Sequence, residues 1–171
     1  IKGVTKLKIE KLALSGFRYS PIDVNGGSNI TITDIDSRQN MKGIILSAGA
    51  RNTVEKSYFE ENYNNGVQVM KNSEYAIVRD NTVVDTGMKF KYGAISGIYI
   101  AAATSSLVQR NTVLRSGWAG ISLWSTTTGS IIEDNYIEKT CQRFGDCGSI
   151  YTSIGFMSLP AKDRLIIRNN F

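Results

Sequence analysis

The sequence of 171 residues contains no histidine. This absence excludes a serine–histidine–aspartate triad, a cysteine–histidine pair, and zinc or iron sites with histidine ligands. Any catalysis must therefore use carboxylates, lysine, arginine, tyrosine or a hard cation held by oxygen. Proline is also scarce, with two residues against sixteen glycines. This composition favours many tight turns and an all-β chain over a helical one.

The sequence also lacks a long apolar run. No stretch approaches the roughly 18–20 apolar residues of a membrane span, so we expect none. There is no signal peptide and no initiator methionine, and the chain stops at "LIIRNNF", inside what reads as a repeat. We therefore expect residues 1–171 to form a single domain cut from a longer protein, with any localisation signal lying elsewhere.

The net charge is +5. This charge is consistent with acidic partners such as uronic-acid polysaccharides, and equally with simple solubility. The basic residues are scattered and form no lysine- or arginine-rich run. We therefore expect no nucleic-acid partner.

One seven-residue pattern is repeated along the chain. "NTVVDTG" at 81–87 is followed by "NTVLRSG" at 111–117. The anchor position of this pattern falls at Ser57, Asn81, Asn111, Asn135 and Asn169, with spacings of 24, 30, 24 and 34 residues. The longer spacings indicate one unit plus an insertion. Insertions are predicted at 88–93, at 141–147 and again near 155–160.

Each unit has a second half, in which a glycine precedes alternating residues. Copies are "GIILS" (43–47), "GVQVM" (66–70), "GIYIA" (97–101) and "GISLW" (120–124). Alternation over four or five residues predicts a strand whose second and fourth positions face a core and whose third faces outward. No unit contains an amphipathic helix of useful length.

A unit of 22–24 residues without a helix cannot bury its own apolar face and must stack on its copies. The pattern predicts an all-β fold, a right-handed parallel β-helix of about seven coils with two loop insertions. Like residues then form ladders from coil to coil, and the anchor asparagines would bond the coils above and below.

Charges before the anchor support this register. The residue preceding each anchor alternates in sign along Lys56, Asp80, Arg110, Asp134 and Arg168. Stacked coils would place opposite charges side by side, which is the favourable arrangement across strands. We interpret these residues as a solvated ladder of ion pairs, not as catalysts.

The repeated units resemble the parallel β-helix repeats of pectate lyases, polygalacturonases, alginate lyases and mannuronan epimerases. The resemblance covers nearly the whole chain and implies the fold more than the activity. It also implies a polysaccharide partner outside the cytoplasm. The segment "GDCGSIYT" (145–152) is similar to a "DGGAIYT" segment of bacterial β-helix proteins related to glycoside hydrolases.

The outward positions of the glycine-led strands are the predicted substrate-binding surface. These candidates are Asp23, Gln68, Tyr99, Ser122 and Tyr151, with Ile45 in the same series and Trp118 and Trp124 near one strand. Tyrosine and tryptophan can stack on sugar rings. The alternative is that the aromatic residues pack beneath the inserted loops.

Catalytic candidates lie in and beside the insertions. They are Asp146, Tyr151, Lys91 and Arg143. Hydrolysis would require a second carboxylate for Asp146, from turns such as those of Asp85 or Glu138, at a separation of about 5–9.5 Å. Lysis of a uronan would instead require a base and a group that neutralises the carboxylate, either arginine or Ca²⁺. Alternatively, Asp146 only caps a turn.

Cys141 and Cys147 flank "QRFGD". In an exported protein a disulfide would pin this loop, and two buried thiols are the alternative. We expect no metal or other cofactor, except Ca²⁺ if the protein is a lyase.

The sequence thus predicts a secreted, periplasmic or cell-surface protein acting on polysaccharide, by glycoside hydrolysis or uronan lysis. A non-catalytic carbohydrate-binding, adhesin or structural β-helix module remains the alternative. Because uncapped β-helix ends expose unpaired strand edges, we expect an isolated piece to associate end to end or to need a cap.

Overall fold

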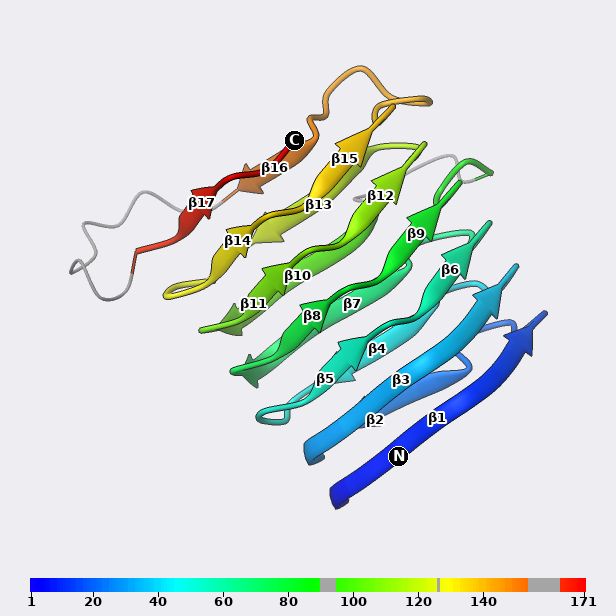
Figure 1. Ribbon diagram of the computed structural model, residues 1–171, viewed down its shortest axis with the longest axis vertical. Helices are drawn as coiled ribbons and strands as arrows, with labels where there is room; N and C mark the ends of the chain where they lie inside the picture. Colours follow the sequence, from blue (N-terminus) through cyan, green and yellow to red (C-terminus); the bar gives the residue numbers. More distant parts are fainter. Residues whose placement is uncertain (90–94, 126, 154–163) are drawn as a thin grey trace.

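The computed structural model describes residues 1–89, 95–125, 127–153 and 164–171. Over these residues the chain forms strands and turns but no helix, so no helix there could cross a membrane. One face is a six-stranded sheet (Figure 1). Its strands are β2 (Ile22–Asn25), β4 (Ile44–Ser47), β7 (Val67–Glu74), β10 (Ser96–Thr104), β13 (Ala119–Trp124) and β16 (Ile150–Ser153).

The remaining strands form an eleven-stranded sheet with two arms. Two long strands, β1 (Thr5–Ser15) and β3 (Ser28–Arg38), run through both arms. The first arm continues with β5 (Thr53–Glu55), β8 (Ile77–Arg79), β11 (Leu107–Gln109), β14 (Ile131–Glu133) and β17 (Ile166–Arg168). The second arm continues with β6 (Tyr58–Glu60), β9 (Thr82–Val84), β12 (Thr112–Leu114) and β15 (Tyr136–Glu138).

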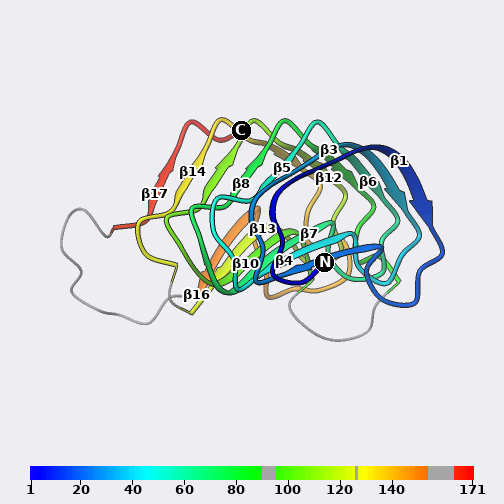
Figure 2. The ribbon, with the colours of Figure 1, turned by 90° about the horizontal axis from the view of Figure 1, so that it is seen from below.

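Every strand pairs in parallel with the equivalent strand of a neighbouring coil. Successive coils therefore advance by the strand spacing of about 4.8 Å. Figure 2 shows the six-stranded sheet and the arms as the sides of one coiled tube. This arrangement is the parallel β-helix that the repeat predicted.

The core fills the inside of this tube. Alternate residues of the six-stranded sheet, such as Ile44, Leu46, Ile98 and Ile100, are fully buried and belong to one apolar cluster. The predicted alternation is therefore correct for the inward positions. Burial of such aliphatic side chains contributes about 1.5–3 kcal/mol each.

The glycines that precede these strands are needed for close packing. A Cβ at Gly97 would lie 2.5 Å from Cγ1 of Val113 and 2.9 Å from the carbonyl oxygen of Gly120. Gly66 and Gly120 have equally tight surroundings. Because a side chain has no space there, the glycine-led pattern marks the corner where the second arm approaches the six-stranded sheet.

The anchor asparagines form a buried ladder across the coils. The backbone N–H of Asn81 donates to Oδ1 of Asn111 at 3.1 Å, and the N–H of Asn111 donates to Oδ1 of Asn135 at 2.9 Å. The Nδ2 of Asn111 donates both to the Val78 carbonyl and to Asn135 Oδ1. Each amide thus binds coils on both sides, as the sequence predicted.

The last anchor was predicted one residue too early. Asn170, not Asn169, accepts the backbone N–H of Asn135 at 3.0 Å. Glu133 pairs with Arg168 in the strand register, which aligns Asn135 with Asn170. The two asparagines are adjacent and similar, so only the strand pairing distinguishes them.

The residue before each anchor has a left-handed backbone conformation. The φ angles of Asp80 and Arg110 are 56° and 52°, and the whole series is Lys11, Asp34, Lys56, Asp80, Arg110, Asp134 and Asn169. Charges alternate along this series as predicted, except that Asn169 replaces Arg168. Arg110 pairs with Asp80 at 2.7 Å, whereas Arg168 pairs with Glu133 at 2.7 Å.

Candidate functional site

The predicted outward positions form one ladder across the six-stranded sheet. Strand pairing aligns each with the next, in the order Asp23, Ile45, Gln68, Tyr99, Ser122 and Tyr151. The register of this surface was therefore predicted correctly.

Part of this ladder is nevertheless covered. Ser122 is fully buried and Gln68 is 6% exposed, so neither is a surface for direct sugar contact as predicted. Ser122 shares a hydrogen bond with Ser96, and Gln68 donates its amide to Asn65. The alternation rule gives the direction of a side chain, but it cannot reveal what lies above it.

Two other ladder residues remain partly accessible. Asp23 and Tyr99 are half-buried. Burial raises the pKa of Tyr99 because loss of water penalises the phenolate. The Tyr99 hydroxyl therefore stays protonated near pH 7.

Three aromatic residues gather at the far end of the ladder. The ring centroids of Trp124 and Tyr151 are 5.8 Å apart with an interplanar angle of 26°. Trp118 lies 4.6 Å from Tyr151 and 6.0 Å from Trp124. Such offset arrangements are favourable and hold the rings in fixed positions.

Trp118 supports this cluster from beneath. It is 7% exposed and packs with Ile95, so the prediction that it lines an open groove is wrong. Its indole N–H donates to the backbone carbonyl of Asp146. Trp124 and Tyr151 are only half-buried, and they present the accessible aromatic surface.

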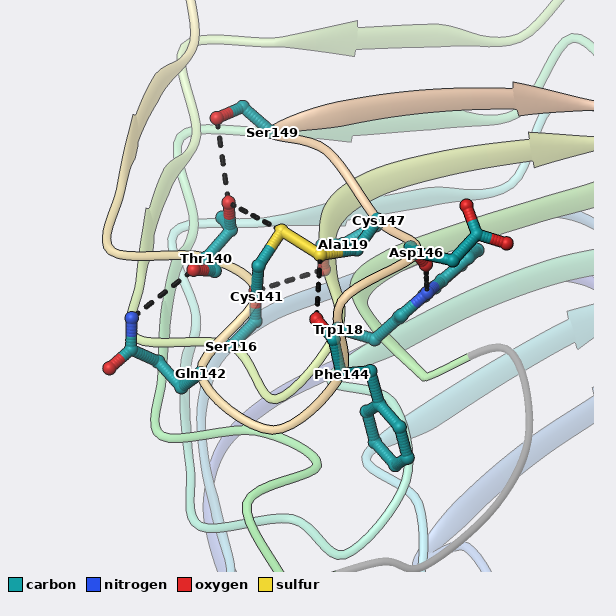
Figure 3. The surroundings of a disulfide bond; sticks show 10 residues. All are labelled: Ser116, Trp118, Ala119, Thr140, Cys141, Gln142, Phe144, Asp146, Cys147 and Ser149. Carbon is teal, nitrogen blue, oxygen red and sulfur yellow. Dashed lines mark hydrogen bonds between the residues drawn. A yellow bond between two sulfur atoms is a disulfide. The ribbon is translucent and has the colours of Figure 1, made fainter.

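A disulfide closes the loop above Trp118. Cys141 and Cys147 are bonded, which excludes the alternative of two free thiols (Figure 3). The backbone N–H of Arg143 donates to the Gly117 carbonyl at 2.9 Å and ties the loop to the previous coil. The side chains of Arg143 and Asp146 are exposed at this loop.

The structure does not bring the other predicted catalytic residues together with Asp146. Lys91 lies outside the described residues. Asp85 pairs with Arg115 at 2.8 Å and Glu138 with Lys139 at 3.1 Å, each at its own turn. Residues 141–153 contain one carboxylate, that of Asp146. Within the described ranges, no three acidic or cysteine side chains are grouped to hold a metal ion.

The corner bearing this disulfide loop contains a second feature. We call this corner the long-loop corner. It is the turn from the second arm into the six-stranded sheet, and residues 85–89 and 139–149 lie in it. A cavity of about 220 Å³ opens there, lined by Glu61, Asn62, Tyr63, Asp85, Met88 and Lys89. Of these cavity residues the sequence singled out only Asp85, as a possible partner for Asp146, and the insertion that contains Met88 and Lys89. Glu61, Asn62 and Tyr63 read as ordinary turn residues.

The stacked parallel coils and the loop-lined outer face define a parallel β-helix protein. The chain belongs to the right-handed β-helix family, since the family described as "Right handed beta helix region" matches residues 1–138. No curated protein matches the chain.

Solved structures with the same fold include enzymes and phage proteins. The alginate lyase from Paenibacillus sp. str. FPU-7 aligns with a TM-score of 0.74 and 20% identity, over 92% of this chain and 55% of that one. The full-length tailspike protein 2 of an Escherichia coli O157:H7 bacteriophage aligns with a TM-score of 0.69 and 13% identity, over 87% of this chain and 20% of that one. The enzymatically active domain of bacteriophage CBA120 tailspike protein 2 aligns with a TM-score of 0.64 and 12% identity, over 95% of this chain and 32% of that one. The chain thus spans about half of the lyase, and these identities establish the fold alone.

Proposed function

We propose that this chain is part of an exported polysaccharide-active β-helix protein that binds a glycan on the outer face at Trp124 and Tyr151. The observation that carries the proposal is the stacking of these two half-exposed rings beside the loop of Arg143 and Asp146. A preordered aromatic surface with polar groups at its edge suits a sugar ring, which has apolar faces and a hydroxyl rim. The disulfide supports export, because such bonds persist in oxidising compartments.

Of the two predicted reactions, elimination from a uronate fits the described residues better. Hydrolysis needs two carboxylates, and the loop and β16 supply only Asp146. Elimination needs a cation to neutralise the uronate carboxylate and a group that moves the proton. Arg143 would supply the cation. The Tyr151 oxygen would take the proton from the carbon beside the uronate carboxylate and return it to the departing glycosidic oxygen, as a C=C bond forms and the bond to that oxygen breaks. The net charge of +5 and the alginate lyase fold neighbour support an anionic substrate.

The test is a panel of alginate, pectate and a neutral glucan, assayed separately for binding, new reducing ends and the ultraviolet absorbance of an unsaturated product. We expect the uronans to bind and to yield unsaturated product. Tyr151→Phe should retain binding but lose turnover, because it keeps the ring and removes the hydroxyl. Tyr151→Ala should lose both.

Other outcomes distinguish the rival functions. Reducing ends without unsaturated product, abolished in Asp146→Asn, would indicate hydrolysis. Binding without any product would indicate a carbohydrate-binding module. Unchanged binding in both Tyr151→Ala and Trp124→Ala would reject the aromatic surface as the site.

A further inference from the structure

The cavity at the long-loop corner is a built concave feature that the aromatic surface does not use. Tyr63 is 39% exposed and forms one wall, and Met88 contributes apolar surface to another. The volume of about 220 Å³ is below the roughly 300–1,000 Å³ of pockets for drug-sized ligands, so it suits a single ring.

The charges around this cavity compensate one another. Asp85 is held by Arg115 through two hydrogen bonds of 2.8 Å. Glu61 accepts a hydrogen bond from Gln39 at 3.0 Å, which together with Lys89 lowers the pKa of its carboxyl. The Lys89 ammonium is 3.5 Å from Glu61, longer than a strong charge-assisted bond.

These properties select a type of ligand. The ionised Glu61 carboxylate is an acceptor at the rim. Tyr63 offers an aromatic face, and the Lys89 ammonium lies over this ring at 5.5 Å from its centroid. The four charged groups described here, those of Glu61, Asp85, Lys89 and Arg115, sum to zero. The cavity would therefore recognise a sugar ring by its hydroxyls and apolar face and not by its carboxylate. A hydroxyl-rich ring can lie on Tyr63 and donate hydroxyls to Glu61.

The cavity lies at the long-loop corner, and the aromatic surface lies on the outer face of the six-stranded sheet beside the disulfide loop of that corner. Backbone bonds at the long-loop corner join Gly87 to Asn62 and Gly117 to Thr86, each at 2.9 Å, so the turns stack coil on coil. Tyr63 lies just before β7, and Tyr151 lies in β16. Three coil steps separate these two strands, from β7 to β10, from β10 to β13 and from β13 to β16. Three steps correspond to about 14 Å along the axis.

We propose that the cavity of Tyr63 and Glu61 is a second glycan subsite, which binds a sugar ring through its hydroxyls and apolar face. One polysaccharide chain would then run parallel to the solenoid axis and occupy this cavity and the Trp124–Tyr151 surface together. This inference rests on the proposed function, because it assigns a further subsite to the same glycan. Occupying both subsites would strengthen binding only for chains long enough to bridge them.

The test measures the dissociation constants of a length series of uronate oligosaccharides for four proteins. They are the wild type, Tyr63→Asn, Tyr151→Ala and the control Tyr75→Asn. Tyr75 is the matched control for Tyr63, since it is exposed and a cationic side chain, that of Arg51, lies over its ring at 5.4 Å. It differs in place, because it lies in the turn that leaves the six-stranded sheet after β7. Its φ of 53° also suits asparagine.

We expect Tyr63→Asn to weaken the binding of long oligosaccharides by about 3- to 10-fold, which is the effect of losing one aromatic contact. The binding of short oligosaccharides should not change. Tyr75→Asn should match the wild type. The subsite would be overturned if Tyr63→Asn left all lengths unchanged, or weakened short and long chains equally, while Tyr151→Ala weakened every length. If Tyr151→Ala also had no effect, the proposed function itself would fail.

Discussion

The indole N–H of Trp118 donates a hydrogen bond to the backbone carbonyl of Asp146, 28 residues later in the sequence. This bond ties the disulfide loop to the platform beneath Tyr151, so loop position and ring position are linked. The loop is closed by the Cys141–Cys147 bond, with a sequence separation of 6. The covalent closure and the aromatic surface are therefore parts of one local structure.

Removing the disulfide should loosen this structure. For the double variant Cys141→Ser, Cys147→Ser we expect the free energy of unfolding to fall by about 2–3 kcal/mol, because the unfolded chain regains the freedom of the short loop. Tryptophan fluorescence should also change in the native state, since Trp118 loses its fixed acceptor. Urea unfolding and emission spectra check both effects, and an unchanged native spectrum would contradict the coupling of loop and platform.

The glycine corner gives a prediction with an internal control. Gly97→Ala should destabilise the fold by about 1–3 kcal/mol, because the new methyl group would overlap Val113 and the Gly120 carbonyl. Gly145→Ala, in the disulfide loop, has no atom within 4 Å of the new methyl group and should change stability by less than about 0.5 kcal/mol. Thermal unfolding of the two variants side by side makes the comparison; equal losses would mean that packing at the corner is not the cause.

The asparagine ladder should respond strongly to truncation. Asn111→Ala removes bonds to coils on both sides and leaves the buried backbone N–H of Asn81 without its acceptor. We expect a loss of about 2–4 kcal/mol, of which the unpaired N–H accounts for about 1–3 kcal/mol. Asn169→Ala should lower the free energy of unfolding less, by about 1–2 kcal/mol, because alanine tolerates the left-handed backbone conformation of this residue poorly. A larger loss in Asn169→Ala than in Asn170→Ala would contradict the register described above.

The ion pair of Asp80 and Arg110 predicts a pH dependence. The hydrogen bond from Arg110 lowers the pKa of the Asp80 carboxyl, so the folded state favours the ionised form. The stabilisation is therefore present above the ordinary aspartate pKa and is lost as the pH falls through the lowered value. Both side chains are accessible to water, so Asp80→Asn should cost less than about 1 kcal/mol at neutral pH and nothing in strong acid.

Urea unfolding across an acid pH series measures this effect. The matched control is Asp34→Asn, at the equivalent turn position with a φ of 53°. Among the described residues Asp34 forms no ion pair. The free energy of unfolding of Asp34→Asn should therefore follow that of the wild type more closely across the pH series. A difference between wild type and Asp80→Asn that did not change with pH would contradict an origin in the carboxylate charge.

The periodic features of the fold could be read directly from the residues. Gly97 and Gly120, or Asn81 and Asn111, recur because each coil must solve the same packing problem at the same place. The outward direction of Tyr99 and Tyr151 follows from strand alternation in the same way. Such inferences succeed because a solenoid repeats local constraints, so that one correct register fixes many positions together.

Features that depend on contacts between different coils and loops could not be read this way. The burial of Trp118 and Ser122 depends on what packs over them, and no local pattern records that cover. The choice of Asn170 over its neighbour depends on the pairing of Arg168 with Glu133. The Tyr63 cavity exists only because turns from two successive coils meet at one corner. The chain's own periodicity therefore fixed the solenoid and the direction of its side chains, whereas packing between distant segments fixed which of them remain accessible to a ligand.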